Sequence, residues 1–255
     1  MQSYGFVGTG ELTAAIVEGL SSSGNPPQIH LSPRNHRIAR DLAARFPNVR
    51  VAGSNQEVLD RTTTVVIAVR PQIARDVLGE LTFRPGHVVV SAVAALTLAE
   101  LRAHVSPAER VVRSIPLPTA SRRASCTALH PDDPAARALF ESVGEVVVPR
   151  DETALAAFSA ATATFAAHLD QLATIAAWMA AHGVRPDDAN AYVAHVFGEL
   201  GHTLRRHDGT LDELAAKHMT PGGINEQFRT ALREAGVPDH IGHGLDDVLA
   251  RLTSQ

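Results

Sequence analysis

The feature that most constrains this chain is the pair of glycines near its start, Gly8-x-Gly10. A short apolar run from Tyr4 to Val7 leads into them, and a helix-compatible segment, residues 11–20, follows at once. In this context the first glycine allows a tight turn, and the second lets the backbone approach a pyrophosphate. The free N–H groups of the new helix then face the negative charge. The pattern predicts a dinucleotide site, and a plain glycine turn is the alternative.

The third glycine of the usual G-x-G-x-x-G pattern is replaced by Thr13, a residue small enough to keep helix and strand close. The residues of this loop that we expect at the cofactor are Gly8, Thr9, Gly10, Glu11 and Leu12.

Residues 1–150 alternate between apolar runs that predict strands and stretches that predict helices. Strands are expected at 29–32, 62–69, 87–93, 110–115 and 143–148, and helices at 35–46, 73–81 and 96–105. Because the runs are apolar on both faces, they indicate a parallel sheet covered by helices. The expected fold is α/β, with an N-terminal Rossmann-type, mostly parallel sheet that carries helices on both faces.

The second part of the chain, residues 151–255, predicts only helices. Residues 153–182 contain no glycine or proline and are rich in alanine, so one unbroken helix is expected there. Further helices are expected at 186–204, 211–218, 224–234 and 241–252. The sequence therefore predicts two domains, a dinucleotide-binding domain at 1–150 and an all-helical domain at 151–255.

Composition excludes several classes of protein. Of the 255 residues, 45% are apolar, and the formal net charge of −4 gives no reason to expect nucleic acid or an acidic membrane as partner. Cys126 is the only cysteine, so no internal disulfide can form. The first strand follows Met1 almost directly, which leaves no room for a signal peptide, and no apolar run is long enough for a membrane helix. We expect a soluble, cytoplasmic protein. The 13 histidines follow no metal-ligand spacing, so no metal is expected.

The end of the second predicted strand indicates which nicotinamide cofactor is bound. An acidic residue there would bind the ribose 2′-hydroxyl of NAD, but no carboxylate occurs before Asp41. Ser32, Arg34 and Arg37 could instead accommodate a 2′-phosphate. This favours NADP (NADPH) over NAD; the alternative is that both arginines are ordinary solvated surface.

The order of these segments resembles the pyrroline-5-carboxylate reductase family. The matching segments, each with the family's motif, are Gly5–Thr13 (G-F-I-G-x-G-N-M-A), Ala68–Gln72 (A-V-K-P-Q), Ser91–Ala95 (a strand ending in serine, then alanines), Arg110–Pro116 (V-x-R-x-M-P) and Thr220–Gly223 (S-P-G-G). The resemblance implies an NADP-dependent oxidoreductase that reduces the C=N bond of a cyclic imine carboxylate, as in proline biosynthesis. It also implies cofactor contacts at Val69, Arg70 and Pro71, and a homodimer formed through the helical domain.

The substrate-side motifs depart from the family. Leu117 stands where the family has an asparagine, and residues 159–165 have lost two glycines and a proline, which predicts a helix running straight through. After the glycine pair, Ile224 and Asn225 replace two small residues, one of them a threonine.

The loop before residue 224 is the main candidate for the substrate site. It precedes a predicted helix start, where free N–H groups could bind an anion, and the resemblance places it near the substrate carboxylate. The expected substrate residues are Ser159, Thr220, Gly222, Gly223 and Asn225. No catalytic residue is assigned, and the candidates by motif are Thr220, Asn225 and Glu226. The alternative is a turn between helices, with Asn225 and Glu226 stabilising the helix start.

Three other functions stay open at this point. A β-hydroxyacid dehydrogenase shares the architecture but usually carries a lysine on its first long helix, and residues 153–182 contain none. A reductase of a different imine or ketone remains possible with the altered pocket. A nucleotide-binding regulator without turnover is an alternative of another class.

Overall fold

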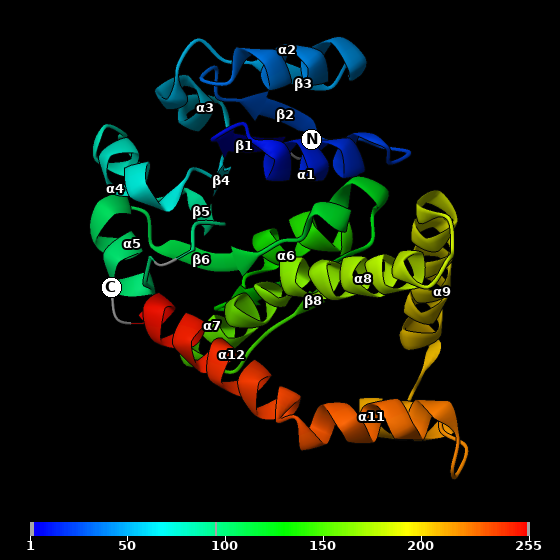
Figure 1. The fold of residues 1–255 in the computed structure, drawn as a ribbon. Helices are drawn as coiled ribbons and strands as arrows, with labels where there is room; N and C mark the ends of the chain where they lie inside the picture. Colours follow the sequence, from blue (N-terminus) through cyan, green and yellow to red (C-terminus); the bar gives the residue numbers. More distant parts are fainter. Residues whose placement is uncertain (1–2, 95, 254–255) are drawn as a thin grey trace. The chain divides into compact units, whose positions relative to one another are not determined.

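The computed structural model describes residues 3–94 and 96–253 (Figure 1). It divides the chain into two compact units. The first contains the described residues up to Ser159 together with residues 251–253, and the second is Ala160–Ala250. The last strand of the described residues ends at Val147, so the change from strands to helices comes near residue 150, where it is expected. The first compact unit nevertheless includes most of helix α7 (Glu152–Thr162), and the domain boundary at residue 150 stays a prediction.

One sheet of eight strands organises the described part of the first unit, in the order β3-β2-β1-β4-β5-β6-β7-β8. Its strands are β1 (Ser3–Val7), β2 (Gln28–Leu31), β3 (Val49–Val51), β4 (Thr64–Ile67), β5 (Val88–Ser91), β6 (Arg110–Ile115), β7 (Ser125–His130) and β8 (Gly144–Val147). Neighbouring strands are parallel throughout except β6 and β7, which are antiparallel. The mostly parallel sheet that the sequence predicts is confirmed.

Helices cover both faces of the sheet because successive side chains of a strand point to opposite faces. Val66 of β4 lies in the core that contains α1 (Glu11–Ser21), α2 (His36–Arg45) and α6 (Pro134–Glu141). Its neighbours Val65 and Ile67 lie in the core that contains α3 (Asn55–Arg61), α4 (Pro71–Gly79) and α5 (Leu98–Val105). These buried strands therefore need apolar residues at every position, which is the pattern that made them recognisable.

Five described elements of the first unit are not predicted by the sequence patterns: β3, α3, the 3₁₀ helix η1 (Pro118–Arg122), β7 and α6. β3 has only three residues, too few to show a period. β7 begins with hydroxyl residues, which conceal it in the sequence; Ser125 and Thr127 are buried and hydrogen-bond each other at 2.9 Å. α6 is marked only by Asp133, whose carboxylate accepts the N–H groups of Ala135 and Ala136, and by a proline at its start.

The second unit contains α8 (Thr164–Ala181), α9 (Pro186–Arg206), α10 (Leu211–Lys217), α11 (Ile224–Glu234) and most of α12 (Val237–Thr253). α8 and α9 form a hairpin with a small core of Ala176, Ala189 and Val193. The start of α12 is a correction, because it begins at Val237 rather than at residue 241; Pro238 is tolerated in its first turn.

The unbroken helix expected over residues 153–182 is wrong. The structure has two helices, α7 and α8, that meet at Ala163. The Ala163 N–H bonds to the carbonyl of Ala160, three residues back, and the Thr164 hydroxyl donates to the Ala161 carbonyl at 2.8 Å. A threonine hydroxyl that bonds to backbone in this way competes with the helix, so an alanine-rich sequence without glycine or proline can still break.

A buried histidine at the start of β5 should make stability depend on pH. His87 is buried, its Nδ1 accepts the Arg84 N–H at 3.0 Å, and burial, helped by the Arg84 charge, lowers its pKa below 6.5. The unfolded chain therefore takes up a proton first as the pH falls. We expect the melting temperature to fall as the pH drops below about 6.5, and less steeply in His87→Gln. Equal slopes for the two proteins in thermal scans from pH 7.5 to 5.5 would contradict this role.

Candidate nucleotide-binding site

The strand order itself defines a binding crevice. β1 has β2 on one side and β4 on the other, so the direction in which the chain crosses the sheet reverses between β1 and β4. In open α/β sheets ligands bind outside the carboxyl ends of the strands at this switch point. The Gly8–Gly10 loop leaves β1 there, and residues 68–71 leave β4 beside it.

The glycine loop is held in place by Ser32, the residue that follows β2. Gly8 adopts φ 100°, and a Cβ on it would overlap the carbonyl oxygen of Ala68, so only glycine fits. The Gly8 N–H donates to the Ser32 hydroxyl at 2.9 Å, and the Thr9 hydroxyl donates to the Ser32 carbonyl at 2.9 Å. The Thr13 hydroxyl closes the turn by donating to the Gly8 carbonyl at 2.6 Å. Thr13 is therefore small enough for close helix–strand packing and also stabilises the turn through its hydroxyl.

Gly10 has a different role from Gly8. It is the N-cap of α1 with an ordinary extended backbone (φ −103°, ψ −171°), and a Cβ on it would meet no atom within 4 Å. No side chain of the described residues caps the helix. The first N–H groups of α1 thus face open space in front of Gly10, as a phosphate site requires. Glu11 is exposed and Leu12 half-buried in the first turn.

The loop after β2 carries the expected 2′-phosphate residues, and they divide into two kinds. Arg34 and Arg37 are exposed, so both guanidinium groups are free to meet a phosphate. Ser32 is fully buried, and its hydroxyl holds the glycine loop. The 2′-phosphate prediction therefore depends on the two arginines, whereas Ser32 shapes the loop that would bind the pyrophosphate.

The loop after β4 completes this part of the crevice. Val69 lies against the glycine loop, since its Cγ1 would be 2.8 Å from a Cβ on Gly8. Arg70 is exposed and is the N-cap of α4, and Pro71 occupies the first turn, where its missing N–H costs nothing. The three residues expected at the cofactor lie at the switch point, and their contact with it stays a prediction.

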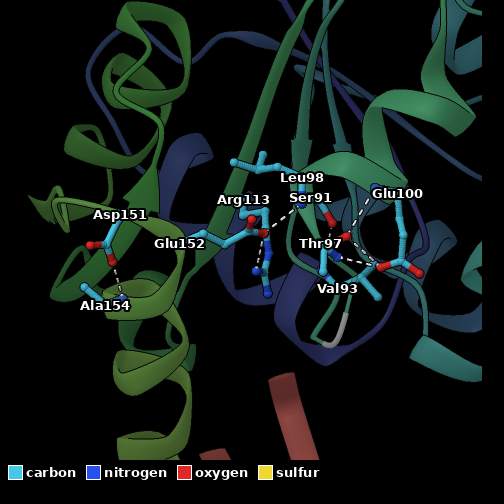
Figure 2. A network of polar contacts seen from close by, with 9 residues as sticks. All are labelled: Ser91, Val93, Thr97, Leu98, Glu100, Arg113, Asp151, Glu152 and Ala154. Carbon is cyan, nitrogen blue, oxygen red and sulfur yellow. Dashed lines mark hydrogen bonds and ion pairs between the residues drawn. The ribbon is translucent and has the colours of Figure 1, made fainter. Parts of the chain in front are cut away.

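A polar network that the sequence does not reveal lies at the carboxyl ends of β5 and β6 (Figure 2). The Arg113 guanidinium donates to Glu152 Oε1 at 2.6 Å, and the same oxygen accepts the N–H of Leu98, the first residue of α5, at 2.7 Å. The Arg113 side chain is only 12% exposed. Asp151, next to Glu152, caps α7 through the Ala154 N–H at 2.7 Å.

The same network fixes both ends of the segment that joins β5 to α5. At its start the Ser91 hydroxyl accepts the Val93 N–H at 3.2 Å, and at its end Thr97 and Glu100 form a capping box. The Arg75 guanidinium and the Thr97 N–H lower the pKa of Glu100 to about 2. The sequence signal for this box is Thr97-x-x-Glu100. Ala95, within the motif at residues 91–95, lies outside the described residues.

The expected substrate residues fall in both units. Ser159 is on α7 in the first unit, while Thr220, Gly222, Gly223 and Asn225 surround the start of α11 in the second. The expected helix start at Ile224 is confirmed. Glu226 turns back so that its carboxylate accepts the Gly222 N–H at 2.6 Å, and the Asn225 amide donates to the His218 carbonyl at 2.8 Å. These contacts stabilise the turn, as the alternative interpretation expects, and any role toward substrate stays a prediction.

Residues 3–94 and 96–253 contain no group of three His, Cys, Asp or Glu side chains that could hold a metal ion. Over the same residues, none of the helices has both the length and the apolar character needed to cross a bilayer.

Comparison with known proteins shows what this chain is similar to. Residues 3–95 match the family described as "NADP oxidoreductase coenzyme F420-dependent". Pyrroline-5-carboxylate reductase 2 of Bacillus subtilis is 23% identical over 263 aligned positions, which cover 98% of this chain and 94% of the relative. The crystal structure of 1-pyrroline-5-carboxylate reductase from Streptococcus pyogenes superposes with a TM-score of 0.85, at 21% identity, over 99% of this chain and 98% of that one. Over nearly its whole length, this chain is similar to pyrroline-5-carboxylate reductases.

A second pyrroline carboxylate reductase structure, from Plasmodium falciparum, was solved with NADP bound. It superposes with a TM-score of 0.81, at 15% identity, over 99% of this chain and 97% of that one. The resemblance to pyrroline-5-carboxylate reductases thus extends over both units in fold, although the motifs diverge at Leu117 in the first unit, across residues 159–165, and at Asn225 in the second unit.

Proposed function

We propose that this chain is an NADPH-dependent reductase of a cyclic imine carboxylate of the pyrroline-5-carboxylate type. The observation that carries the proposal is the similarity to a pyrroline-5-carboxylate reductase along 98% of the chain, together with an uncapped helix N-terminus at the switch point of the sheet. A β-hydroxyacid dehydrogenase is not favoured, because residues 153–182 contain no lysine.

We further infer a cytoplasmic location, which the single, unpaired Cys126 suits.

The residues present fit a dinucleotide. The space in front of Gly10 is one that a larger side chain would fill, and the first turn of α1 has no side-chain cap among the described residues. Gly8, Thr9 and Gly10 would hold the pyrophosphate, and Arg34 and Arg37 the 2′-phosphate. When bound, NADPH would supply a hydride to the imine carbon.

The helical unit would bind the imine and need not supply a strong acid. A protonated imine already carries the proton that the product nitrogen keeps, so its carbon is electrophilic without a general acid. Thr220 and Asn225 would orient the substrate, and the Glu226 carboxylate would stay with the Gly222 N–H, which it accepts in this structure. This account is consistent with a candidate site that has no obvious acid.

Initial rates of NADPH oxidation test the proposed function. The purified protein is assayed with the five-membered imine carboxylate, its six-membered analogue and a panel of β-keto acids. The proposal expects the highest kcat/KM with a cyclic imine carboxylate. Turnover of a β-keto acid and of neither imine would overturn it.

The preference for NADPH over NADH should depend on the two arginines after β2. We expect Arg34→Ala and Arg37→Ala each to raise the Kd for NADPH on the order of tenfold, because a charge-assisted hydrogen bond to the 2′-phosphate is lost. The Kd for NADH should stay unchanged. Arg40→Ala, an exposed arginine further along α2, is the matched control. An equal fall in affinity for NADPH and NADH, measured by fluorescence titration, would show that the arginines do not bind the 2′-phosphate.

We also infer a homodimer formed through the helical unit. No residue of α11 is buried, and Ile224 and Phe228 on it are 83% and 60% exposed. Helices with such exposed apolar surface usually pack against another apolar surface. The same helices of a second copy offer one. Light scattering should give twice the chain mass of 27.1 kDa. A monomer that stays monomeric at high micromolar concentration would contradict the inference.

A further inference from the structure

The Arg113–Glu152 pair joins three elements at the edge of the sheet where the chemistry is expected. Arg113 lies in the carboxyl-terminal half of β6, paired in register with Ser91, the last residue of β5. Glu152 opens α7, and its Oε1 is shared between the Arg113 guanidinium and the Leu98 N–H that begins α5 (Figure 2). One carboxylate oxygen thus connects β6, α5 and α7.

The pair also fixes the segment between β5 and α5. At the β5 end the Ser91 carbonyl accepts the Ser114 hydroxyl at 3.1 Å, which ties β5 to β6. At the α5 end, Leu98 is bound to Glu152. The position of this segment relative to the sheet therefore depends on a contact between residues 54 positions apart in the chain.

The segment lies on the side of the switch point that suits the nicotinamide half of the cofactor. A doubly wound fold binds the two halves of a dinucleotide on either side of the switch point. Arg34 and Arg37 follow β2, so the half that carries the 2′-phosphate belongs on the β2 side of the switch point. The other half would then lie over the ends of β4, β5 and β6, where Ser91 ends β5 and Arg113 is its partner in register on β6.

We propose that Arg113 and Glu152 are positioning residues for hydride transfer, which hold Leu98 and the start of α5 in place beside the nicotinamide. This inference rests on the proposed function. Neither residue needs to touch the substrate. Removing the Glu152 carboxylate leaves the largely buried Arg113 charge without its partner and frees the Leu98 N–H, so the segment loses its anchor. A displacement of about 1 Å at a reacting centre can cost on the order of a hundredfold in rate.

The chain offers a matched control for this pair. Arg110, at the other end of β6, pairs with Asp133 at 2.7 Å, and Asp133 also accepts N–H groups at the start of a helix, α6. The Asp133 side chain is 10% exposed. Asp133→Ala therefore removes the same kinds of contact as Glu152→Ala, but at the amino end of the strand, away from the crevice.

The test compares Glu152→Ala with Asp133→Ala in the full-length protein. We expect both variants to melt at lower temperature. Glu152→Ala should lower kcat at least tenfold, keep the Kd for NADPH within about twofold, and show a larger isotope effect with deuterated NADPH, since hydride transfer becomes slower. Glu152→Gln keeps an acceptor for the Leu98 N–H and should recover part of kcat. Asp133→Ala should keep kcat within about twofold.

The outcomes separate the inference from the proposed function. Equal effects of Glu152→Ala and Asp133→Ala on kcat would overturn the positioning role. If the wild-type protein binds NADPH but reduces no imine, the proposed function fails. The positioning role is then tested by the fluorescence emission spectrum of bound NADPH. A spectrum altered by Glu152→Ala and not by Asp133→Ala supports the role at the nicotinamide, and identical spectra refute it.

Discussion

Replacing Gly10 with valine is expected to abolish NADPH binding and to leave the fold intact. The backbone of Gly10 is extended in a way that any residue adopts, and a Cβ there would meet nothing within 4 Å. The valine side chain would instead occupy the space in front of the first N–H groups of α1. Because several charge-assisted hydrogen bonds to the pyrophosphate would be lost together, the Kd for NADPH should rise more than about a hundredfold.

The measurement is a fluorescence titration with NADPH beside a thermal melt. Gly24→Val is the control, because a Cβ on Gly24, in the loop between α1 and β2, also meets nothing within 4 Å. It should bind NADPH like the wild type. Unchanged NADPH affinity in Gly10→Val would remove the basis for every function proposed here that uses this cofactor.

Replacing Gly8 with alanine is expected to damage the fold itself. Gly8 has φ 100°, which L side chains rarely adopt, and an added Cβ would overlap the Ala68 carbonyl and lie 2.8 Å from Val69 Cγ1. Conformational strain and overpacking together should cost roughly 2–5 kcal/mol of unfolding free energy. The loss of unfolding free energy follows from the close approach of the loops after β1 and β4. This close approach forms the crevice.

Urea unfolding of Gly8→Ala beside Gly10→Ala separates the two glycines. Gly10→Ala should unfold at the wild-type urea concentration within error, whereas Gly8→Ala should unfold at a much lower one. Equal midpoints would mean that the loop relaxes without cost and that Gly8 is not required by the packing against Ala68.

The sequence predicts most of the sheet because its central strands are buried on both faces. Residues 62–69 and 87–93 are almost continuously apolar or β-branched, and β4 and β5 fall within them. β7 has no such run, since its buried positions include Ser125 and Thr127, which satisfy each other through a hydrogen bond. A strand stabilised by paired hydroxyls cannot be recognised from apolar periodicity.

The glycine loop could be predicted because its signal is local, whereas the rest of the site depends on long-range contacts. Gly8 and Gly10 are two residues apart and stand between a strand and a helix. Ser32 lies 24 residues from Gly8, and its fully buried hydroxyl bonds to the loop, a role that residue type alone does not indicate. Arg113 and Glu152 are 39 residues apart, and only the fold brings them together.

The break between α7 and α8 shows a further limit of propensity. Alanine predicts helix throughout residues 153–182, yet the Thr164 hydroxyl competes for the Ala161 carbonyl and the hydrogen-bond pattern shifts at Ala163. Ser159, one turn earlier, stays within α7. A helical propensity summed over a window does not register a local competition of this kind.

The most direct test of the central claim is to follow a deuterium atom from the cofactor. The purified protein is mixed with NADPH carrying two deuterium atoms at C4 and with the five-membered imine carboxylate, and the product is analysed by mass spectrometry and NMR. The account predicts a saturated ring one mass unit heavier, with the deuterium on the former imine carbon and a proton on nitrogen. Bound NADPH that transfers no deuterium to this or to the six-membered imine would contradict the account and leave a nucleotide-binding protein with another role.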